Sequence, residues 1–438
     1  MCCAAFDQVV RDLIQVTADS LRADHCGWQS GAATTPNLDR LARDSLVFET
    51  AVAPGPRTLS SVPVSQTGTP FAPNRHGTDS YEDRASRIRS HLERFRTVSQ
   101  RLREEGYTTV AFTANPWTST NTDFDAGFDR FHEVGRTGGR LISLFDGTPV
   151  EKPAILADRW LSNDTWFSQW RTFYDDIRAT LEEVDGPVYV WVFLMDTHNP
   201  YIVPRQDRQE SSAFGMWAAS LRANRVLGTK GDRTAYGSNI DDTTLRRLGQ
   251  AYRDGVRSVD AFVDRLMGDL AEDAVLLFHS DHGEGFGEHG TYGHTPVLYE
   301  ENLHVPLLVH GTDTDGTVEA PVSTARIPEI LLSCAREEPL EAGDLTAGHA
   351  VARTESDDAI ALRGERWKYV RREDEERLYD LQADPGETAD VGDENPAVRS
   401  EVRGACDEYL DSLPEPSVSA TVEEDEDVKR HLRSLGYL

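Results

Sequence analysis

The stretch HSDHGEGFGEHG at residues 279–290 constrains this chain more than any other, and it follows directly on an apolar run at residues 274–278. A buried strand that ends on Asp281 and His282 fixes both side chains, and the glycines that follow let the backbone approach closely. Carboxylate and imidazole groups are common ligands of divalent metal ions. The stretch therefore predicts one half of a metal site at the end of a central strand.

Further apolar runs have the length and composition of buried strands. The clearest is VYVWVFLM at residues 188–195, and shorter ones cover residues 13–17 and 107–112. Between them lie helical patterns, such as residues 252–270, in which apolar side chains recur every three or four positions. This alternation predicts an α/β fold with a mostly parallel central sheet that helices cover on both faces.

Asp19 completes the set of metal ligands that the strand pattern suggests. It follows the run at residues 13–17, as Asp281 and His282 follow their own strand. An Asp in such a place is more often a helix N-cap, but parallel strands present their carboxyl ends at one edge of a sheet, where ligands bind. We therefore expect these three side chains to hold one divalent ion, Mn, Mg or Ca with Zn as a further candidate, and to leave a coordination position for substrate.

The pattern of apolar and polar residues changes near residue 350. Short apolar runs there alternate with polar turns, which predicts an antiparallel sheet, and a helical pattern follows. These runs lie at residues 360–362, 367–371 and 378–381, and the helix at residues 396–413. We therefore expect a catalytic domain at residues 1–345 and a small C-terminal α+β subdomain at residues 346–438 that packs on it.

Two polar segments are expected to contribute little to the core. Residues 69–90 are rich in turn formers, which favours a surface excursion. Residues 205–245 carry few apolar anchors, which favours a long insertion at the surface or near the active site.

The charge balance limits the partners of this protein. Its formal net charge is −30, from 75 acidic and 45 basic residues, and Lys occurs only at positions 152, 230, 368 and 429. A surface this acidic repels nucleic acid and anionic membranes, so we expect neither as a partner. Acidic, Lys-poor proteins stay soluble in high salt, and we expect a halophilic, haloarchaeal source.

The cysteines and the hydropathy indicate a compartment. Five scattered cysteines form neither a disulfide framework nor a metal knuckle, which favours a reducing environment. No apolar run approaches the roughly 20 residues that span a bilayer, and charged residues stand where a signal peptide would be apolar. We expect a cytoplasmic protein.

Several segments resemble, in order, the motifs of the sulfatase family within the alkaline phosphatase superfamily. They are VTADSLRADHCG, TTPNLDRLARDSLVFETAVAP, RLREEGYTTVAFTANP, FLMDTHNPY, SDHGEGFGEHG, LYEENLHVPLLVHG, RWKYV with LYDLQADPGE, and LRSLGYL. The likeness extends from about residue 13 to the last residue. It implies an alkaline phosphatase-like fold and an enzyme that cleaves sulfate or phosphate esters at a metal ion.

The resemblance implies that Thr58 is the nucleophile and a further metal ligand. Sulfatases carry a Cys or Ser here that becomes formylglycine, followed by Pro two and Arg four residues later. This chain has Ser60 and Val62 at those places, and threonine cannot become formylglycine. A threonine nucleophile is the pattern of relatives that transfer or hydrolyse phosphoryl and phosphonyl groups. Ser61 is an alternative nucleophile, and Arg57 is expected to replace the missing cation and clamp substrate oxygens.

Other residues receive expected roles from the same resemblance. His198 matches a histidine that contacts the anion or protonates the leaving group, and His294 and Asn115 are expected to bind substrate. Asp24 and His25 match the first motif, where a structural role is as plausible as substrate contact. Glu284 and His289 are candidates for positioning the metal ligands.

The predicted reaction is the hydrolysis of a small-molecule or carbohydrate sulfate or phosphate ester. A phosphonate or phosphodiester hydrolase, or a phosphoryl transferase, is the alternative within the superfamily, and a degenerate protein that binds anions without turnover is the alternative of another class. The Asp281–His282 pair replaces the Asp-Asn of many calcium sulfatases, which favours Mn, Mg or Zn. The sequence is silent on oligomeric state.

Overall fold

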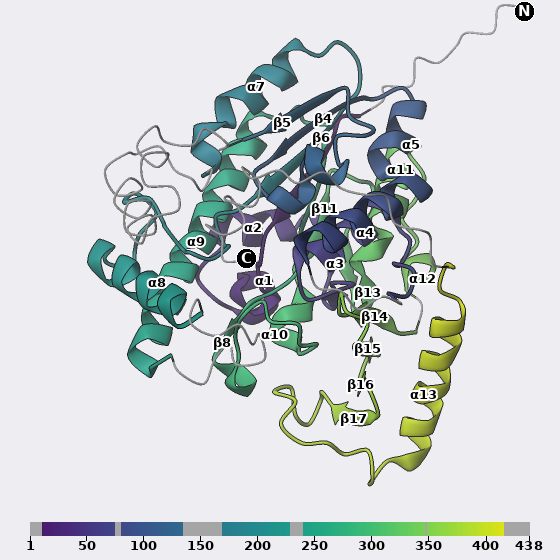
Figure 1. Cartoon of the computed structure of the whole chain (residues 1–438). Coiled ribbons are helices and arrows are strands. Elements are labelled where there is room, and N and C mark those ends of the chain that lie inside the picture. Colours follow the sequence, from purple (N-terminus) through teal and green to yellow (C-terminus); the bar gives the residue numbers. More distant parts are fainter. Residues whose placement is uncertain (1–10, 75–79, 135–168, 228–239, 347, 416–438) are drawn as a thin grey trace, which may run out of the picture.

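The central element is an eight-stranded sheet in the order β12-β2-β11-β7-β1-β6-β4-β5. The computed structural model describes residues 11–74, 80–134, 169–227, 240–346 and 348–415 (Figure 1). All strands of this sheet run parallel except β11, which is antiparallel to both of its neighbours. The strands are β1 (Leu13–Ala18), β2 (Ser45–Phe48), β4 (Thr108–Thr113), β5 (Arg130–Glu133), β6 (Val188–Leu194), β7 (Val275–Ser280), β11 (Leu307–His310) and β12 (Gly316–Val318).

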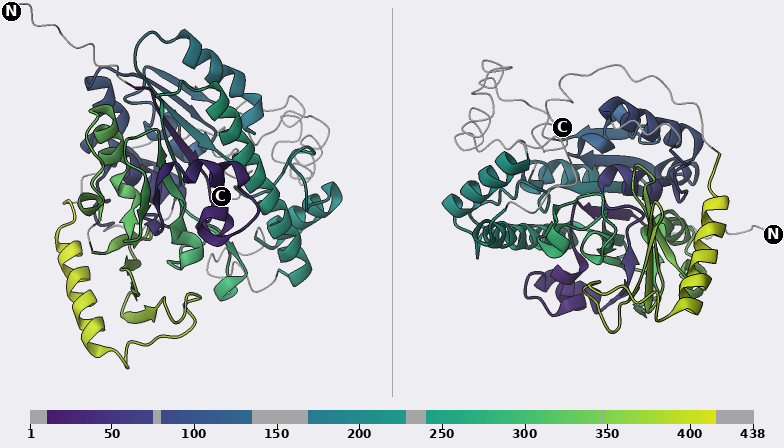
Figure 2. Two further views of the ribbon diagram at one scale, coloured as in Figure 1. Left: turned by 180° about the vertical axis from the view of Figure 1, so that it is seen from behind. Right: turned by 60° about the horizontal axis from the view of Figure 1, so that its bottom comes forward.

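Helices cover both faces of the sheet, and each face has its own hydrophobic core (Figures 1 and 2). Successive residues of β1 show why: Leu13 packs in one core and Ile14 in the other, because strand side chains alternate between faces. One face is covered by α2 (Pro36–Ala42), α7 (Tyr174–Glu183) and α9 (Asp242–Asp269), and the other by α3 (Thr58–Thr67), α4 (Tyr81–Arg94), α5 (Val98–Glu104) and α11 (Ile327–Ala335). The predicted fold class is confirmed.

The expectation of a surface excursion at residues 69–90 is wrong, because α4 begins within it. Its apolar residues Tyr81, Ala85, Ile88 and Leu92 are spaced at helical intervals and pack in the core beside α3. Ser80 caps the helix by accepting a hydrogen bond from the backbone amide of Asp83. Many charged residues lie between these positions, so the composition of the segment does not reveal its apolar stripe.

The C-terminal part contains a four-stranded antiparallel sheet, as the alternating runs predict. Its strands are β14 (Ala350–Arg353), β15 (Ala359–Arg363), β16 (Trp367–Arg372) and β17 (Glu375–Asp380). Helix α13 (Pro396–Asp411) packs on one face of it. Ala350 and Ala352 on the other face pack against Val52, Leu298 and Leu303. The C-terminal sheet is thus joined to the main body by an apolar contact, and the division at residue 345 stays a prediction.

Short elements complete the described chain. They are β3 (Ala51–Val52), β10 (His304–Val305) and β13 (Val322–Ser323), which form a small sheet, the hairpin β8 (Gly285–Phe286) and β9 (Tyr292–Gly293), and the helices α1 (Gly27–Ser30), α8 (Ala213–Leu227), α10 (Glu300–Leu303) and α12 (Ala342–Leu345). Helix α8 lies within the segment expected to be an insertion. Among the described residues, no helix has both the length and the apolar character needed to cross a membrane.

Candidate functional site

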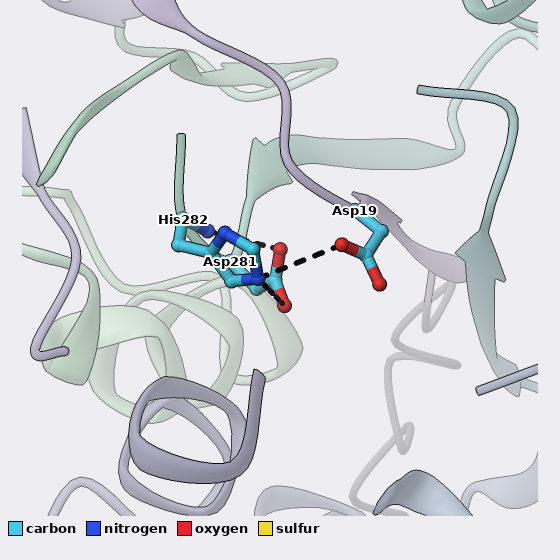
Figure 3. Close-up of side chains that lie close together, drawn as sticks. All are labelled: Asp19, Asp281 and His282. Atoms are coloured by element: carbon cyan, nitrogen blue, oxygen red, sulfur yellow. Dashed lines mark hydrogen bonds and ion pairs between the residues drawn. The ribbon is translucent and has the colours of Figure 1, made fainter. Parts of the chain in front are cut away.

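Three predicted metal ligands meet at the carboxyl edge of the central sheet. β1 and β7 are adjacent parallel strands with Ala18 opposite Ser280, so Asp19 and Asp281 leave the sheet side by side. His282 comes next, and Figure 3 shows the three side chains turned toward one another. Their ligand atoms lie within 4.8 Å of one another, and all three side chains are buried. Asp19, Asp281 and His282 are called the metal group below.

The contacts of the metal group fit a divalent cation. His282 Nε2 lies 3.6 Å from Asp19 Oδ1 and 3.6 Å from Asp281 Oδ2, too far for hydrogen bonds. Asp281 Oδ2 is buried and makes no hydrogen bond to the described residues. His282 Nδ1 lies 2.8 Å from the carbonyl oxygen of Gly283, so Nδ1 carries the proton and the Nε2 lone pair is directed at the carboxylates. One cation between these atoms would satisfy all three.

The charges of the metal group favour the same conclusion. Burial and the negative charge of Asp19 raise the pKa of Asp281 well above its ordinary value. Burial also acts to raise the pKa of Asp19, but the charges of His198, His282 and His294 outweigh it, so that the pKa of Asp19 is lowered. Two buried carboxylates this close repel each other, and a bound cation would stabilise both in the ionised form.

Backbone geometry holds the two loops that carry the metal group. Ser20 adopts a left-handed conformation with φ of 62°, and its backbone amide donates to Asp281 Oδ1 at 3.2 Å. The amides of Gly283 and Glu284 donate to carbonyl groups of helix α10. A Cβ atom at Gly283 would lie 2.0 Å from the carbonyl oxygen of Glu301, so only glycine fits this close approach.

Thr58 lies against the metal group at the first position of helix α3. Its buried Oγ1 is 3.3 Å from His282 Nε2. Asn115 Nδ2 lies 3.4 Å from the same hydroxyl oxygen and donates to Asp19 Oδ2 at 2.8 Å, so one amide group bridges Thr58 and Asp19. Thr58 is the first residue of this helix and therefore lies at the positive end of the helix dipole.

Two further histidines line the same site. The ring of His294 lies 5.0 Å from that of His198 and 5.1 Å from that of His282, measured between centroids. Glu284 Oε1 lies 3.3 Å from His294 Nδ1, while its Oε2 accepts a hydrogen bond from the Tyr201 hydroxyl at 2.8 Å. Burial raises the pKa of Glu284 to about 7. Glu284 thus contacts His294 rather than the metal group, and Tyr201 in the motif FLMDTHNPY was not singled out from the sequence.

Arg57 precedes Thr58 and forms a buried ion pair. Its Nη1 donates to Glu355 Oε1 at 2.6 Å, and the two side chains are 8% and 7% exposed. Glu355 lies in the turn between β14 and β15, 298 residues further along the chain. The sequence does not single out Glu355, because nothing distinguishes it from the many other acidic residues.

Asp24 takes part in a set of contacts that joins the two loops that carry the metal group. Arg22 donates to both carboxylate oxygens of Asp24, at 2.9 and 2.6 Å. The same guanidinium donates to the carbonyl oxygen of Glu284 and, at 2.8 Å, to Glu288 Oε1. His25 packs edge-on against Tyr252. These contacts are structural ones, and Arg22 had not been singled out from the sequence.

The remaining candidates lie apart from the metal group in their contacts. His289 bonds with Glu301 and the carbonyl oxygen of Gly386, and its ring stacks on Tyr299 at 3.6 Å. Ser61 lies one turn along α3 from Thr58, and its buried Oγ makes no hydrogen bond to the described residues. Of the two candidate nucleophiles, Thr58 is therefore the one that contacts the metal group.

Known proteins resemble this chain in sequence and in fold. The family model described as Sulfatase matches residues 11–336. Choline-sulfatase of Rhizobium meliloti is 29% identical over 183 residues, which cover 36% of this chain and 35% of that protein. Human iduronate 2-sulfatase is 22% identical over 362 residues, which cover 73% of this chain and 61% of that protein. The chain thus spans less than two thirds of either relative.

A solved structure shares the fold over most of both chains. It is the phosphonate monoester hydrolase of Agrobacterium radiobacter, with a TM-score of 0.64 and 19% identity over 92% of this chain and 95% of that one. At this identity the likeness establishes the fold. Together with the family match, it confirms the resemblance that the motifs indicate.

Proposed function

This chain belongs to the sulfatase family, and we propose that it is a metal-dependent hydrolase that cleaves sulfate or phosphate esters with Thr58 as the nucleophile. One observation carries the proposal: Thr58 Oγ1 lies 3.3 Å from His282 Nε2, inside a buried group of two carboxylates and an imidazole. The names of the relatives, choline-sulfatase and iduronate 2-sulfatase, support a small-molecule or carbohydrate ester as substrate.

The metal group and Thr58 Oγ1 would hold the divalent ion. Two carboxylate oxygens, one imidazole nitrogen and a hydroxyl suit Mn, Mg or Zn, and Ca remains a candidate because oxygen ligands predominate. When bound, such an ion lowers the pKa of a coordinated hydroxyl and neutralises a nonbridging oxygen of the ester.

The residues around Thr58 would divide the chemistry among them. Thr58 Oγ attacks the sulfur or phosphorus atom and gives up its proton, the bond to the alcohol breaks, and water then releases the anion from threonine. Asn115 holds the Thr58 hydroxyl in place, and the N-terminus of α3 stabilises negative charge on its oxygen. His198 would give a proton to the leaving alcohol, and His294 would bind a nonbridging oxygen.

A phosphonate monoester or phosphodiester hydrolase is the second candidate. Two residue choices favour it over a typical sulfatase reaction. Threonine stands in the nucleophile position, where formylglycine cannot form, and the pair Asp281–His282 stands where many calcium sulfatases have Asp-Asn. One of the solved structures with this fold is a phosphonate monoester hydrolase.

Turnover by the Mn-loaded protein in high salt tests the proposal. The substrates are an aryl sulfate, a phosphate monoester, a phosphodiester and a phosphonate monoester. We expect Thr58→Ala to lower kcat by at least about 1,000-fold, as loss of a nucleophile does, and Ser61→Ala to retain most activity. Unchanged turnover in Thr58→Ala would remove Thr58 as the nucleophile, and no turnover of any ester would favour an anion-binding protein.

A further inference from the structure

The C-terminal sheet contributes one charged side chain to the surroundings of Thr58. Glu355 lies beyond residue 336, where the family match ends, and its Oε1 accepts the hydrogen bond from Arg57 Nη1. The turn that carries Glu355 is anchored on the main body, since the backbone amide of Arg353 donates to the carbonyl oxygen of Pro54. A part of the chain outside the matched region therefore reaches the residue next to the nucleophile.

Glu355 is a charged group inside the protein. Burial acts to raise its pKa, but the charges of Arg57 and Arg84 outweigh burial, so that the pKa of Glu355 is lowered and the carboxylate stays ionised. Its second oxygen, Oε2, is buried and makes no hydrogen bond to the described residues. The turn also carries Asp357, which pairs with Arg87 and Arg353 at 3.3 and 2.7 Å. Glu355 is thus the carboxylate of this turn that balances Arg57.

The charge of Arg57 reaches the reaction centre. Arg57 is the N-cap residue of helix α3, directly before Thr58, and its side chain is buried. An anion bound between Thr58 and His294 would feel its charge. Any group that neutralises Arg57 therefore changes the potential at the bound anion, because partly buried charges are poorly screened.

Two sets of formal charges beside the expected position of the anion are each balanced. A divalent ion balances the carboxylates of Asp19 and Asp281, and Glu355 balances Arg57. Sulfate monoesters, phosphodiesters and phosphonate monoesters carry one negative charge, whereas a fully ionised phosphate monoester carries two. A buried site without spare positive charge penalises the second charge.

We propose that Glu355 is a specificity-determining residue, which neutralises Arg57 beside Thr58 and so makes the site select singly charged esters over doubly charged phosphate monoesters. The inference rests on the proposed function for its site but adds the charge class of the substrate. Through Glu355, the C-terminal sheet would then contribute to substrate specificity. A purely structural Arg57–Glu355 pair would affect stability and leave this selection unchanged.

Binding of two matched probes tests the proposal without turnover. Benzenesulfonate and phenylphosphonate have the same shape and lack an ester bond, and at mildly alkaline pH they carry one and two charges. Calorimetry on the Mn-loaded full chain should show tighter binding of benzenesulfonate. In Glu355→Gln the ratio of the two affinities should move toward phenylphosphonate by about tenfold, the order of magnitude expected for one charge at this range.

Matched variants separate charge from structure. Asp357→Asn removes a charge from the same turn but not from Arg57, and should leave the affinity ratio within about twofold of wild type. Glu355→Asp keeps the carboxylate and should keep the wild-type preference. The double variant Arg57→Gln with Glu355→Gln keeps the net charge and should restore the preference that Glu355→Gln alone changes. A ratio in Glu355→Gln equal to that of wild type, or a shift in Asp357→Asn of the same size, would overturn the proposal.

Two outcomes of these experiments lead to different conclusions. If Glu355→Gln does not fold, Arg57→Gln replaces it, and the preference must then move about tenfold further toward benzenesulfonate; an unchanged ratio would overturn the proposal. If no ester is turned over by wild type, the proposed hydrolase function fails, while the shift in affinity ratio still decides the role of Glu355.

Discussion

Two groups of buried charges in this protein are built in opposite ways. The metal group places two carboxylates and a histidine together with no Lys or Arg among its members, and Asp281 Oδ2 makes no hydrogen bond to the described residues. The lysine group, Lys368 with Glu300, Glu387 and Arg363, joins β16 and β15 to helix α10. In it Lys368 Nζ lies 2.9 Å from Glu300 Oε1 and 2.7 Å from Glu387 Oε1, so two cations balance two carboxylates.

The pKa values of Glu300 and Asp281 follow this difference, whereas burial and the charge of Glu300 raise the pKa of Glu387. In the lysine group, burial acts to raise the pKa of Glu300, but the charges of Lys368 and Arg363 outweigh it and lower the pKa to about 2. In the metal group, burial and Asp19 together raise the pKa of Asp281. A balanced group stabilises the fold by itself, whereas an unbalanced one is stabilised by a ligand from outside. Buried charge alone therefore does not mark a functional site; the lack of balance does.

The largest stability effect is expected in the lysine group. Lys368→Met leaves the buried carboxylates of Glu300 and Glu387 without the cation that contacts both, and should lower the free energy of unfolding by about 3 to 5 kcal/mol. Its affinity for Mn should equal that of wild type. Chemical denaturation and calorimetry measure the two quantities.

A surface ion pair of the same sheet provides the control for Lys368→Met. Arg366 pairs with Asp380 and its side chain is 50% exposed, so Arg366→Gln should cost less than about 1 kcal/mol. Equal costs for Lys368→Met and Arg366→Gln would show that the lysine group does not act as a buried, balanced unit.

A substitution in the metal group should have the opposite effect on the stability of the metal-free protein. Asp281→Asn removes a ligand and should weaken Mn binding by more than about 100-fold. It also removes the repulsion from Asp19 while its amide oxygen can still accept from Ser20, so the metal-free protein should become more stable by about 1 kcal/mol. Melting curves with chelator and with Mn measure both effects. A metal-free Asp281→Asn protein less stable than wild type would contradict the unbalanced state of the metal group.

The sequence predicts well the features that follow from a single general rule of the fold. Asp19, Asp281 and His282 follow predicted strands, and parallel strands end at one edge of a sheet, so their meeting needed no knowledge of packing. The α/β fold follows from the alternation of strand and helix patterns in the same way. The roles of the other site residues were expected only through resemblance, and they remain proposals.

What the sequence does not predict depends on contacts between distant segments. The Arg57–Glu355 pair requires that a turn of the C-terminal sheet packs beside α3, which no local pattern encodes. The contact between Arg22 and Glu288 likewise joins two loops that are far apart in the chain. Among 75 acidic residues, only the folded structure separates Glu355 and Glu288 from those that merely face solvent.

A dependence of stability on pH also tests the balance of the lysine group. The pKa of Glu300 is lowered from 4.5 to about 2 by the folded environment, so its contribution to stability is present above pH 4.5 and is lost as the pH falls toward 2. The difference in unfolding free energy between wild type and Glu300→Gln should shrink by about 2 kcal/mol from pH 5 to pH 3.

Matched unfolding curves at both pH values, taken with chelator to exclude metal effects, measure this difference. Glu365→Gln provides the reference, because Glu365 is exposed. A difference between wild type and Glu300→Gln that stays constant over this range would mean that Lys368 and Arg363 do not hold Glu300 ionised. The lysine group would then be unbalanced as well, and the contrast with the metal group would rest on geometry alone.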